Sequence, residues 1–210
     1  MKKTLFFLFS VCAIVAQAQS IDTIIDKGIY QSYFNYHLKQ PVMVAYKLYH
    51  AGGDCSRAGD RFKNDAPIAT ATQRDYDHSG YDEGHLADSK DFAYDCSAQE
   101  ATFRFYNCLP QTPNLNRGIW KHWETTIRQE SQDDSLLVIA GGVFSGSMTG
   151  NMYVPVRCWK VVKTLSGGLI THVLYCTNTQ SGAECEEQNL AAFYMELDPM
   201  AAKELKLLLQ

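Results

Sequence analysis

Three short segments near the middle of the chain decide its fold: YDEGHLA at residues 81–87, YNCLPQ at residues 106–111 and NRGIWKHWE at residues 116–124. The first segment places His85 directly after a glycine. The third begins with Asn116 and carries Glu124 eight residues later. Carried on two strands and a helix, these side chains could place a general base opposite a hard-metal site. The sequence therefore predicts a ββα unit.

The third segment has the pattern of an amphipathic helix over residues 116–129. Trp120, Trp123 and Ile127 recur at the i, i+3, i+7 spacing of a buried stripe. At 100° per residue, Asn116 and Glu124 lie within a band about 80° wide, so their oxygen atoms face the same side. Such donors suit Mg²⁺, with Mn²⁺ as a substitute. Spacing alone also allows Asn116 to be only a helix cap and Glu124 a solvated charge.

Two further side chains belong to the same unit. His85 is expected at the edge of a strand, where a neutral imidazole with a pKa near the working pH could take a proton from water. The alternative is a structural histidine bonded to backbone, which is also our interpretation of the other five: His37, His50, His78, His122 and His172. Arg128 follows Glu124 by four residues, a spacing at which the two side chains can pair.

The remaining elements are expected to be mainly strands. β-branched, aromatic or alternating residues predict strands at 41–49, 102–107, 136–140, 154–162 and 169–175, the last two forming a hairpin. Residues 51–65 and 110–114 are expected to be loops, and residues 199–209 an amphipathic helix. No repeat, low-complexity tract or linker divides the chain. We expect one α+β domain over residues 19–210.

The first 18 residues are predicted to be a signal peptide. Lys2 and Lys3 give a positive start, and the apolar run at 5–15 is too short to span a bilayer. Residues 16–18 (AQA) then fit the small-x-small cleavage pattern. The alternative is a membrane anchor. The mature protein is expected to be secreted or periplasmic, with no membrane attachment.

The cysteines fit that expectation. Six of them follow the leader: Cys55, Cys96, Cys108, Cys158, Cys176 and Cys185. In an exported chain they predict up to three disulfides, whose pairing the sequence leaves open. The alternative is a zinc site, but the sequence has no C-x-x-C pair.

The charge balance argues mildly against nucleic acid as a partner. The chain has a net charge of −4, and loss of Lys2 and Lys3 would take it to −6. A non-specific DNA binder usually carries a basic footprint. The basic residues are nevertheless grouped on either side of His85: Arg57, Arg61, Lys63 and Arg74 before it, Arg104, Arg117, Lys121 and Arg128 after it. A local footprint is therefore retained.

The three segments resemble the DNA/RNA non-specific endonuclease family, the ββα-metal (His-Me finger) nucleases. That family carries Asp-Arg-Gly-His, then Asn-x-x-Pro-Gln, then Asn-x-x-x-Trp-x-x-x-Glu. This chain has Asp82–His85, Asn107–Gln111 and Asn116–Glu124 in the same order and spacing. The resemblance extends from about Val44 to Thr177.

The resemblance implies a role for each matching residue. His85 would be the general base that activates the attacking water. Asn116 would bind Mg²⁺ directly, Glu124 would hold a metal-bound water, and Asn107 would support the site. The metal would polarise the scissile phosphate of DNA, or of RNA, and stabilise the leaving 3′ oxygen.

The resemblance also implies cationic contacts to the phosphate. Arg128 would lie near it, together with an upstream arginine, Arg57 or Arg61. Contacts to the backbone alone would make cutting tolerant of sequence.

Two positions depart from the family pattern. Glu83 stands where the signature has arginine, and Asp88 where the family usually has proline. We expect Glu83 to point away from the site or to pair with a nearby basic residue. Arg57, Arg61 or Arg128 would then supply the missing positive charge.

Together these features predict a secreted Mg²⁺-dependent endonuclease. The fold would be a central antiparallel sheet flanked by helices, with the ββα-metal unit on one face. A second hypothesis is a catalytically silent relative that binds nucleic acid or a protein. A third is a zinc hydrolase that uses His78, His85 and Asp82 or Asp88.

Overall fold

A seven-stranded antiparallel sheet forms the centre of the part of the chain that the computed structural model describes, residues 20–210. The predicted leader at 1–18 lies outside the described residues. The strand order is β1-β2-β3-β6-β7-β8-β9. The strands are β1 (Thr23–Asp26), β2 (Tyr30–Asn35), β3 (Gln40–Leu48), β6 (Leu136–Thr149), β7 (Met152–Thr164), β8 (Ile170–Thr177) and β9 (Cys185–Glu187).

A second, two-stranded sheet lies outside this one and carries the first two of the three segments. β4 (Asp82–His85) pairs antiparallel with β5 (Cys108–Gln111), and a helix follows, so the ββα unit is present. The helical elements are α1 (Gln73–Tyr76), η1 (Ser89–Phe92), α2 (Cys96–Ala101), η2 (Phe105–Asn107), η3 (Leu115–Trp120), α3 (Lys121–Glu130), α4 (Leu190–Glu196) and α5 (Pro199–Leu208).

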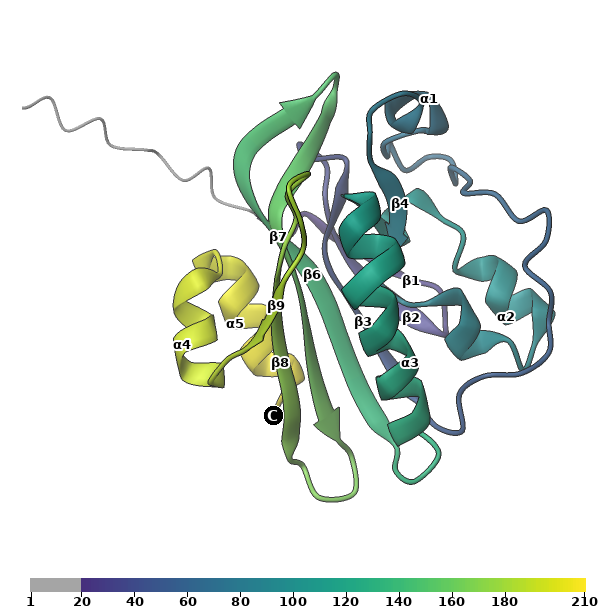
Figure 1. The fold of residues 1–210 in the computed structure, drawn as a ribbon, viewed down its shortest axis with the longest axis vertical. Coiled ribbons are helices and arrows are strands. Elements are labelled where there is room, and N and C mark those ends of the chain that lie inside the picture. The colour runs from purple at the N-terminus through teal and green to yellow at the C-terminus, as the bar shows by residue number, and fades with distance from the viewer. Residues whose placement is uncertain (1–19) are drawn as a thin grey trace, which may run out of the picture.

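Helices cover both faces of the large sheet, as Figure 1 shows. On one face, buried residues of the central strands pack against Trp120 and Ile127 of η3 and α3. On the other face they pack against Phe193 and Leu205 of α4 and α5. Side chains of a strand alternate between the two faces of the sheet, and here both faces are covered by helices. β3 is therefore apolar at nearly every position. The predicted α+β fold with a central antiparallel sheet is confirmed.

Most of the predicted strands are also confirmed, and β6 and β7 are longer than expected. The helix at 199–209 is α5. The sequence did not predict β1, β2 or the one-turn α1.

The strand predicted at 102–107 is wrong. Its end forms η2, and the strand begins only at Cys108, so Pro110 and Gln111 lie in β5 rather than in a loop. The turn is held by the Asn107 amide, which donates to the carbonyl oxygens of Ala87 (3.0 Å) and Thr102 (2.9 Å). These side-chain bonds stabilise a turn in place of strand pairing, and the alternation of Phe103 and Phe105 in the sequence could not reveal them.

The helix at 116–129 is present but irregular. Its first turn is the π-helix η3, where Gly118 has non-helical angles (φ −104°, ψ −112°), and the regular helix α3 begins at Lys121. A π-turn adds a residue to the turn and changes the direction of the side chains before it. The uniform 100° spacing used to place Asn116 and Glu124 on one side is therefore only approximate.

Two disulfides form within the described residues: Cys55–Cys96 and Cys176–Cys185. Cys108 and Cys158 are buried free thiols. Of the three disulfides allowed by the sequence, two are therefore present. No helix within residues 20–210 is long and apolar enough to cross a membrane.

Candidate active site

The ββα unit lines a cavity of about 730 Å³. His85 of β4, Asn116 of η3, and Glu124 and Arg128 of α3 all line it. Arg57 and Arg61 of the loop that follows β3 also line it, whereas Asn107 does not. The structure thus brings six of the seven predicted site residues to one cavity: His85, Asn116, Glu124, Arg128, Arg57 and Arg61.

His85 lies at the end of β4 in an aromatic surrounding and is 7% exposed. The Phe62 ring lies 4.5 Å from the imidazole, and the Phe103 ring meets it edge-on at 4.7 Å. Nε2 lies 3.5 Å from the Thr102 hydroxyl oxygen. The His85 carbonyl accepts a hydrogen bond of 3.2 Å from the Trp120 indole, which ties β4 to η3.

Burial lowers the pKa of His85 to about 3; Asp88 opposes this shift, and Arg57 and Lys160 add to it. The prediction of a pKa near the working pH is therefore wrong for the protein without metal or substrate. The imidazole is neutral at neutral pH. In that form it can accept a proton.

Asn107 acts on the backbone rather than on the cavity. Besides the two bonds that hold η2, its Oδ1 accepts from the Ala87 amide at 3.0 Å. Asn107 is fully buried. It therefore supports the loop directly after His85 and lines no part of the cavity.

The glycine before His85 makes room for the Gln111 side chain. A Cβ at Gly84 would lie 2.2 Å from Oε1 of Gln111, which is fully buried on the paired strand. The Gly-His and Pro-Gln parts of the two motifs are thus linked by packing. A side chain at position 84 would force the buried Gln111 side chain, or the strand that carries His85, to shift.

Asn116 is not a helix cap. It lies inside η3, and its Nδ2 donates to Oδ2 of Asp82 at 3.0 Å. Its Oδ1 accepts no hydrogen bond from a residue in the range 20–210. Arg117 binds both oxygens of the same carboxylate, at 2.8 and 2.6 Å. Asp82 therefore fixes which way round the Asn116 amide lies.

Glu124 is not a solvated surface charge. Its side chain is 12% exposed, and its ion pair within residues 20–210 is with Lys160, 3.9 Å away. Burial raises the pKa of Glu124 well above its usual value, and nearby Asp88 adds to this effect. A cation that binds beside this carboxylate would favour its ionised form.

Arg128 does not form the predicted pair with Glu124. Its guanidinium binds Asp88 and, at 2.8 Å, Asp91, both of which are buried. Asp88 and Asp91 are two buried carboxylates that share this cation, whereas Glu124 has Lys160 nearby, which explains why the i, i+4 spacing did not decide the partner. Burial raises the pKa of Asp91 to about 7, and Asp88 adds to the increase.

Asp88 therefore has a structural use at its position. Its Oδ1 accepts from the Lys90 amide at 3.2 Å and caps η1, and its Oδ2 is the partner of Arg128. A proline could do neither.

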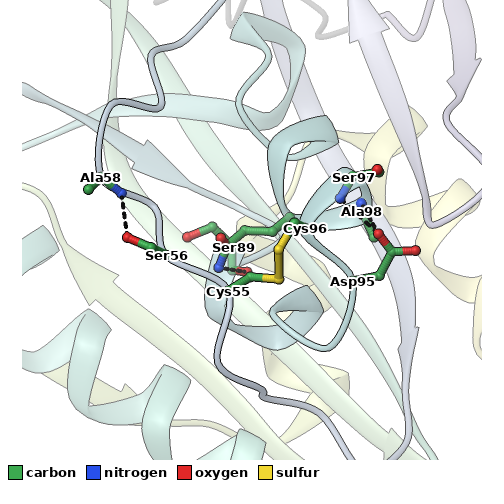
Figure 2. Close-up of a disulfide and its surroundings, with 9 residues drawn as sticks. Cys55, Ser56, Ala58, Ser89, Asp95, Cys96, Ser97 and Ala98 are labelled. Carbon is green, nitrogen blue, oxygen red and sulfur yellow. Dashed lines mark hydrogen bonds between the residues drawn. A yellow bond between two sulfur atoms is a disulfide. The ribbon is translucent and has the colours of Figure 1, made fainter.

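The loop that carries Arg57 and Arg61 is anchored by a disulfide (Figure 2). Cys55 is bonded to Cys96 at the start of α2, and its amide donates to the Ala93 carbonyl at 3.1 Å. The Arg57 guanidinium lies 5.5 Å from the Phe103 ring centroid. Both arginines are exposed. The anchor keeps their loop next to the His85 side of the cavity.

Glu83 neither points away nor pairs with a basic residue. It lines the cavity, and its carboxylate accepts a hydrogen bond of 2.8 Å from Gln73 of α1. That part of the expectation is wrong. Glu83 makes the α1 side of the cavity more negative, while Arg57 and Arg61 line the cavity as cations.

The donor set fits a hard cation better than zinc. Asn116 and Glu124 offer amide and carboxylate oxygens to one cavity, and Mg²⁺ needs few protein ligands because it keeps most of its waters. Within residues 20–210, no group of three or more His, Cys, Asp or Glu side chains could hold a metal. His78 does not line the cavity. The zinc hypothesis therefore has no ligand set.

Sequence reasoning missed Phe62, which lines the cavity, and the bond from Asn116 to Asp82. It also missed Asp91 and Lys160, which do not line the cavity but pair with Arg128 and Glu124. Phe62 and Lys160 are distant in sequence from the three motifs. Only tertiary contacts reveal them. Asp91 follows His85 by six residues and could have been noticed as a charge in an otherwise apolar stretch.

Comparison with known proteins agrees with the geometry. The family described as DNA/RNA non-specific endonuclease matches residues 10–201, beyond the stretch that the motifs suggested. A nuclease of Nostoc sp. is 35% identical over 113 residues, which cover 50% of this chain and 41% of that protein. Human mitochondrial endonuclease G is 32% identical over 96 residues, or 44% of this chain and 32% of that protein.

The chain thus spans less than half the length of these two relatives. The fold also matches a chain of the crystal structure of the EndoG/EndoGI complex. The TM-score is 0.65 at 20% identity, covering 81% of this chain and 82% of that one. This likeness concerns the fold. Together, the family match and the cavity lead to one conclusion: the chain belongs to the DNA/RNA non-specific endonuclease family.

Proposed function

We propose that the protein is a Mg²⁺-dependent endonuclease that hydrolyses phosphodiester bonds of DNA, and of RNA as a second substrate class, without sequence preference. The observation that carries the proposal is the convergence of His85, Asn116 and Glu124 on one cavity with two exposed arginines. Membership of the family supports a nuclease.

In this proposal His85 takes a proton from the attacking water. Its low pKa keeps the imidazole free but makes it a weak base. A phosphate bound beside it would raise that pKa, because a nearby negative charge favours the imidazolium. Asp88 already acts in this direction. Base strength would therefore rise when the substrate arrives.

Asn116 and Glu124 would hold the cation. When bound, the ion would supply Lewis-acid activation of the phosphate and neutralise the charge on the leaving oxygen. Asp82 would keep the Asn116 oxygen directed at the ion by occupying its amide nitrogen. Arg57 and Arg61 would contact substrate phosphates, and Arg128 would act mainly through Asp88 and Asp91.

We also propose secretion or export to the periplasm. The two disulfides suit an oxidising compartment, as does the leader pattern at 1–18.

The test is digestion of supercoiled plasmid by the oxidised protein with Mg²⁺, with Mn²⁺ and with EDTA. We expect cutting in either metal and none in EDTA. His85→Ala should lower the rate by at least about 10²-fold, the usual contribution of a general base. His122→Ala, at an exposed histidine on α3, is the matched control and should cut normally.

Glu83 in the cavity and the negative net charge favour a second candidate, a silent relative that binds nucleic acid or a protein. Folded, oxidised protein that cuts nothing in either metal, yet retains DNA in a binding assay, would establish this candidate in place of the enzyme.

A further inference from the structure

Lys160 of β7 is a buried lysine that does not line the cavity but contacts Glu124, which does. Its side chain is 1% exposed and lies on the α3 face of the sheet. Lysine is almost never fully buried unless its charge has partners, because an unpaired ammonium loses its hydration. The contacts of this ammonium therefore show what it is retained for.

The ammonium contacts the first and the third of the three segments that form the site. Nζ donates to the Leu86 carbonyl, one residue after His85, at 3.2 Å. It lies 4.3 Å from the centroid of the Trp120 ring, whose indole binds the His85 carbonyl. It is also 3.9 Å from Oε1 of Glu124. One side chain thus joins the histidine loop, η3 and α3.

The charges explain why Glu124 depends on this contact. Arg128 lies one turn beyond Glu124 on α3, but its guanidinium is engaged by Asp88 and Asp91. Within residues 20–210, Glu124 forms its ion pair with Lys160. At 3.9 Å the ammonium is close enough to attract the carboxylate, while a metal could still approach the cavity side of Glu124.

We propose that Lys160 is a positioning residue of the nuclease site, which holds the Glu124 carboxylate and the backbone after His85 in the arrangement that binds the metal. This inference rests on the proposed function. It assigns Lys160 no contact with substrate.

The substitution that isolates the charge is Lys160→Met. Methionine fills a similar apolar volume but leaves Glu124 and the Leu86 carbonyl without their cation. Lys160→Arg restores the positive charge. The matched control is Lys163→Met on the same strand, since Lys163 also donates to a backbone carbonyl, that of Leu209 at 2.6 Å, away from the cavity.

Two measurements are made on the oxidised full-length protein: kcat and KM on a DNA duplex, and direct binding of Mn²⁺ followed by the electron paramagnetic resonance of the free ion. For Lys160→Met we expect kcat to fall and Mn²⁺ binding to weaken by about 10- to 100-fold each, as for other residues that orient metal ligands. KM for DNA should change by less than about threefold, because Lys160 contacts no phosphate. Lys160→Arg should recover most of the loss.

Lys160→Met that matches Lys163→Met in both measurements would overturn the proposal. So would a loss that Lys160→Arg fails to recover in any part, since a purely structural lysine gives that result. If Lys160→Met does not fold, the ammonium signals of ¹⁵N-lysine wild-type protein are followed during a Mg²⁺ titration. The slowly exchanging buried signal should shift and the others should not; an unmoved buried signal refutes the proposal.

Failure of the nuclease itself would be distinguishable. Wild-type protein that binds Mn²⁺ but cuts no DNA refutes the enzyme, and the Mn²⁺ affinity of Lys160→Met still decides the positioning role.

Discussion

The floor and the rim of the cavity carry similar charges but hold them in different ways. The floor, as we use the word, is a network of buried or mostly buried charges: Asp88, Glu124 and Arg128 line the cavity, and Asp91 and Lys160 do not line it but bind these side chains. The rim consists of the more exposed Arg57, Arg61, Glu83 and Arg117. Floor residues bind one another. Rim residues instead contact single neighbours outside their group: Arg117 binds Asp82 of β4, Glu83 accepts from Gln73 of α1, and Arg57 lies over the Phe103 ring.

The difference teaches what each region can do. Charges removed from water must be paired, because the desolvation of an unpaired one is expensive, so the floor has one arrangement. Exposed charges are screened and contribute little to folding, so the rim is free to meet a substrate. The predictions below test this division, beginning with the largest expected effect.

Arg128→Met should destabilise the protein by about 3–5 kcal/mol, because it leaves Asp88 and Asp91 buried without a cation. Urea unfolding at neutral pH measures the change. Arg117→Met is the rim control: the Arg117 side chain is 71% exposed, and its loss should leave the free energy of unfolding nearly unchanged. Equal effects of the two substitutions would show that burial does not separate floor from rim.

Removal of the rim anchor by Cys55→Ser with Cys96→Ser should cost about 4 kcal/mol, from the closure entropy of its 41-residue span. Removal of Cys176–Cys185, which spans nine residues, should cost about 3 kcal/mol by the same relation. In addition, only the first pair should raise KM for DNA, because it anchors the loop of Arg57 and Arg61. An equal KM change in both variants would argue against that anchor.

Acid should destabilise the wild type through His85. Its folded pKa of about 3 lies below the unfolded value of about 6.5, so only the unfolded chain gains a proton as pH falls between these values. Stability is therefore lost as pH falls through this window, by up to about 1.4 kcal/mol per pH unit.

Asp91 has the opposite sign, since its folded pKa of about 7 makes stability fall as pH rises from about 4 to 7. The difference between wild type and His85→Gln, measured by urea unfolding in EDTA, isolates the histidine. A difference that does not shrink as pH falls from 6.5 would contradict the assignment.

Glu83→Arg should have the smallest effect. It breaks one exposed bond to Gln73 and removes a negative charge from the rim. The melting temperature should stay within about 2 °C. We expect kcat/KM on DNA to rise by less than about tenfold, because one exposed electrostatic contact contributes no more free energy than that factor represents. A larger rise would mean that Arg57 and Arg61 do not replace the signature arginine, and Glu83→Gln separates charge removal from charge addition.

Much of the fold could be predicted because its signals are local. The apolar stretches of β3, β6, β7 and β8 and the stripe of Trp120 and Ile127 are periodic in sequence. η2 was missed because Asn107 satisfies backbone groups twenty residues away. The kink at Gly118 was missed because spacing arguments assume a regular helix.

The sequence by itself determined which side chains could do chemistry: a histidine after Gly84, and an amide and a carboxylate eight residues apart on one helix. Only the tertiary structure decided their partners. Arg128 binds Asp88 and Asp91 rather than Glu124, and Lys160 reaches Glu124 from a strand. The reason is physical. Chain geometry limits which residues are neighbours on one element, but desolvation, which depends on the whole fold, selects which buried charges must pair.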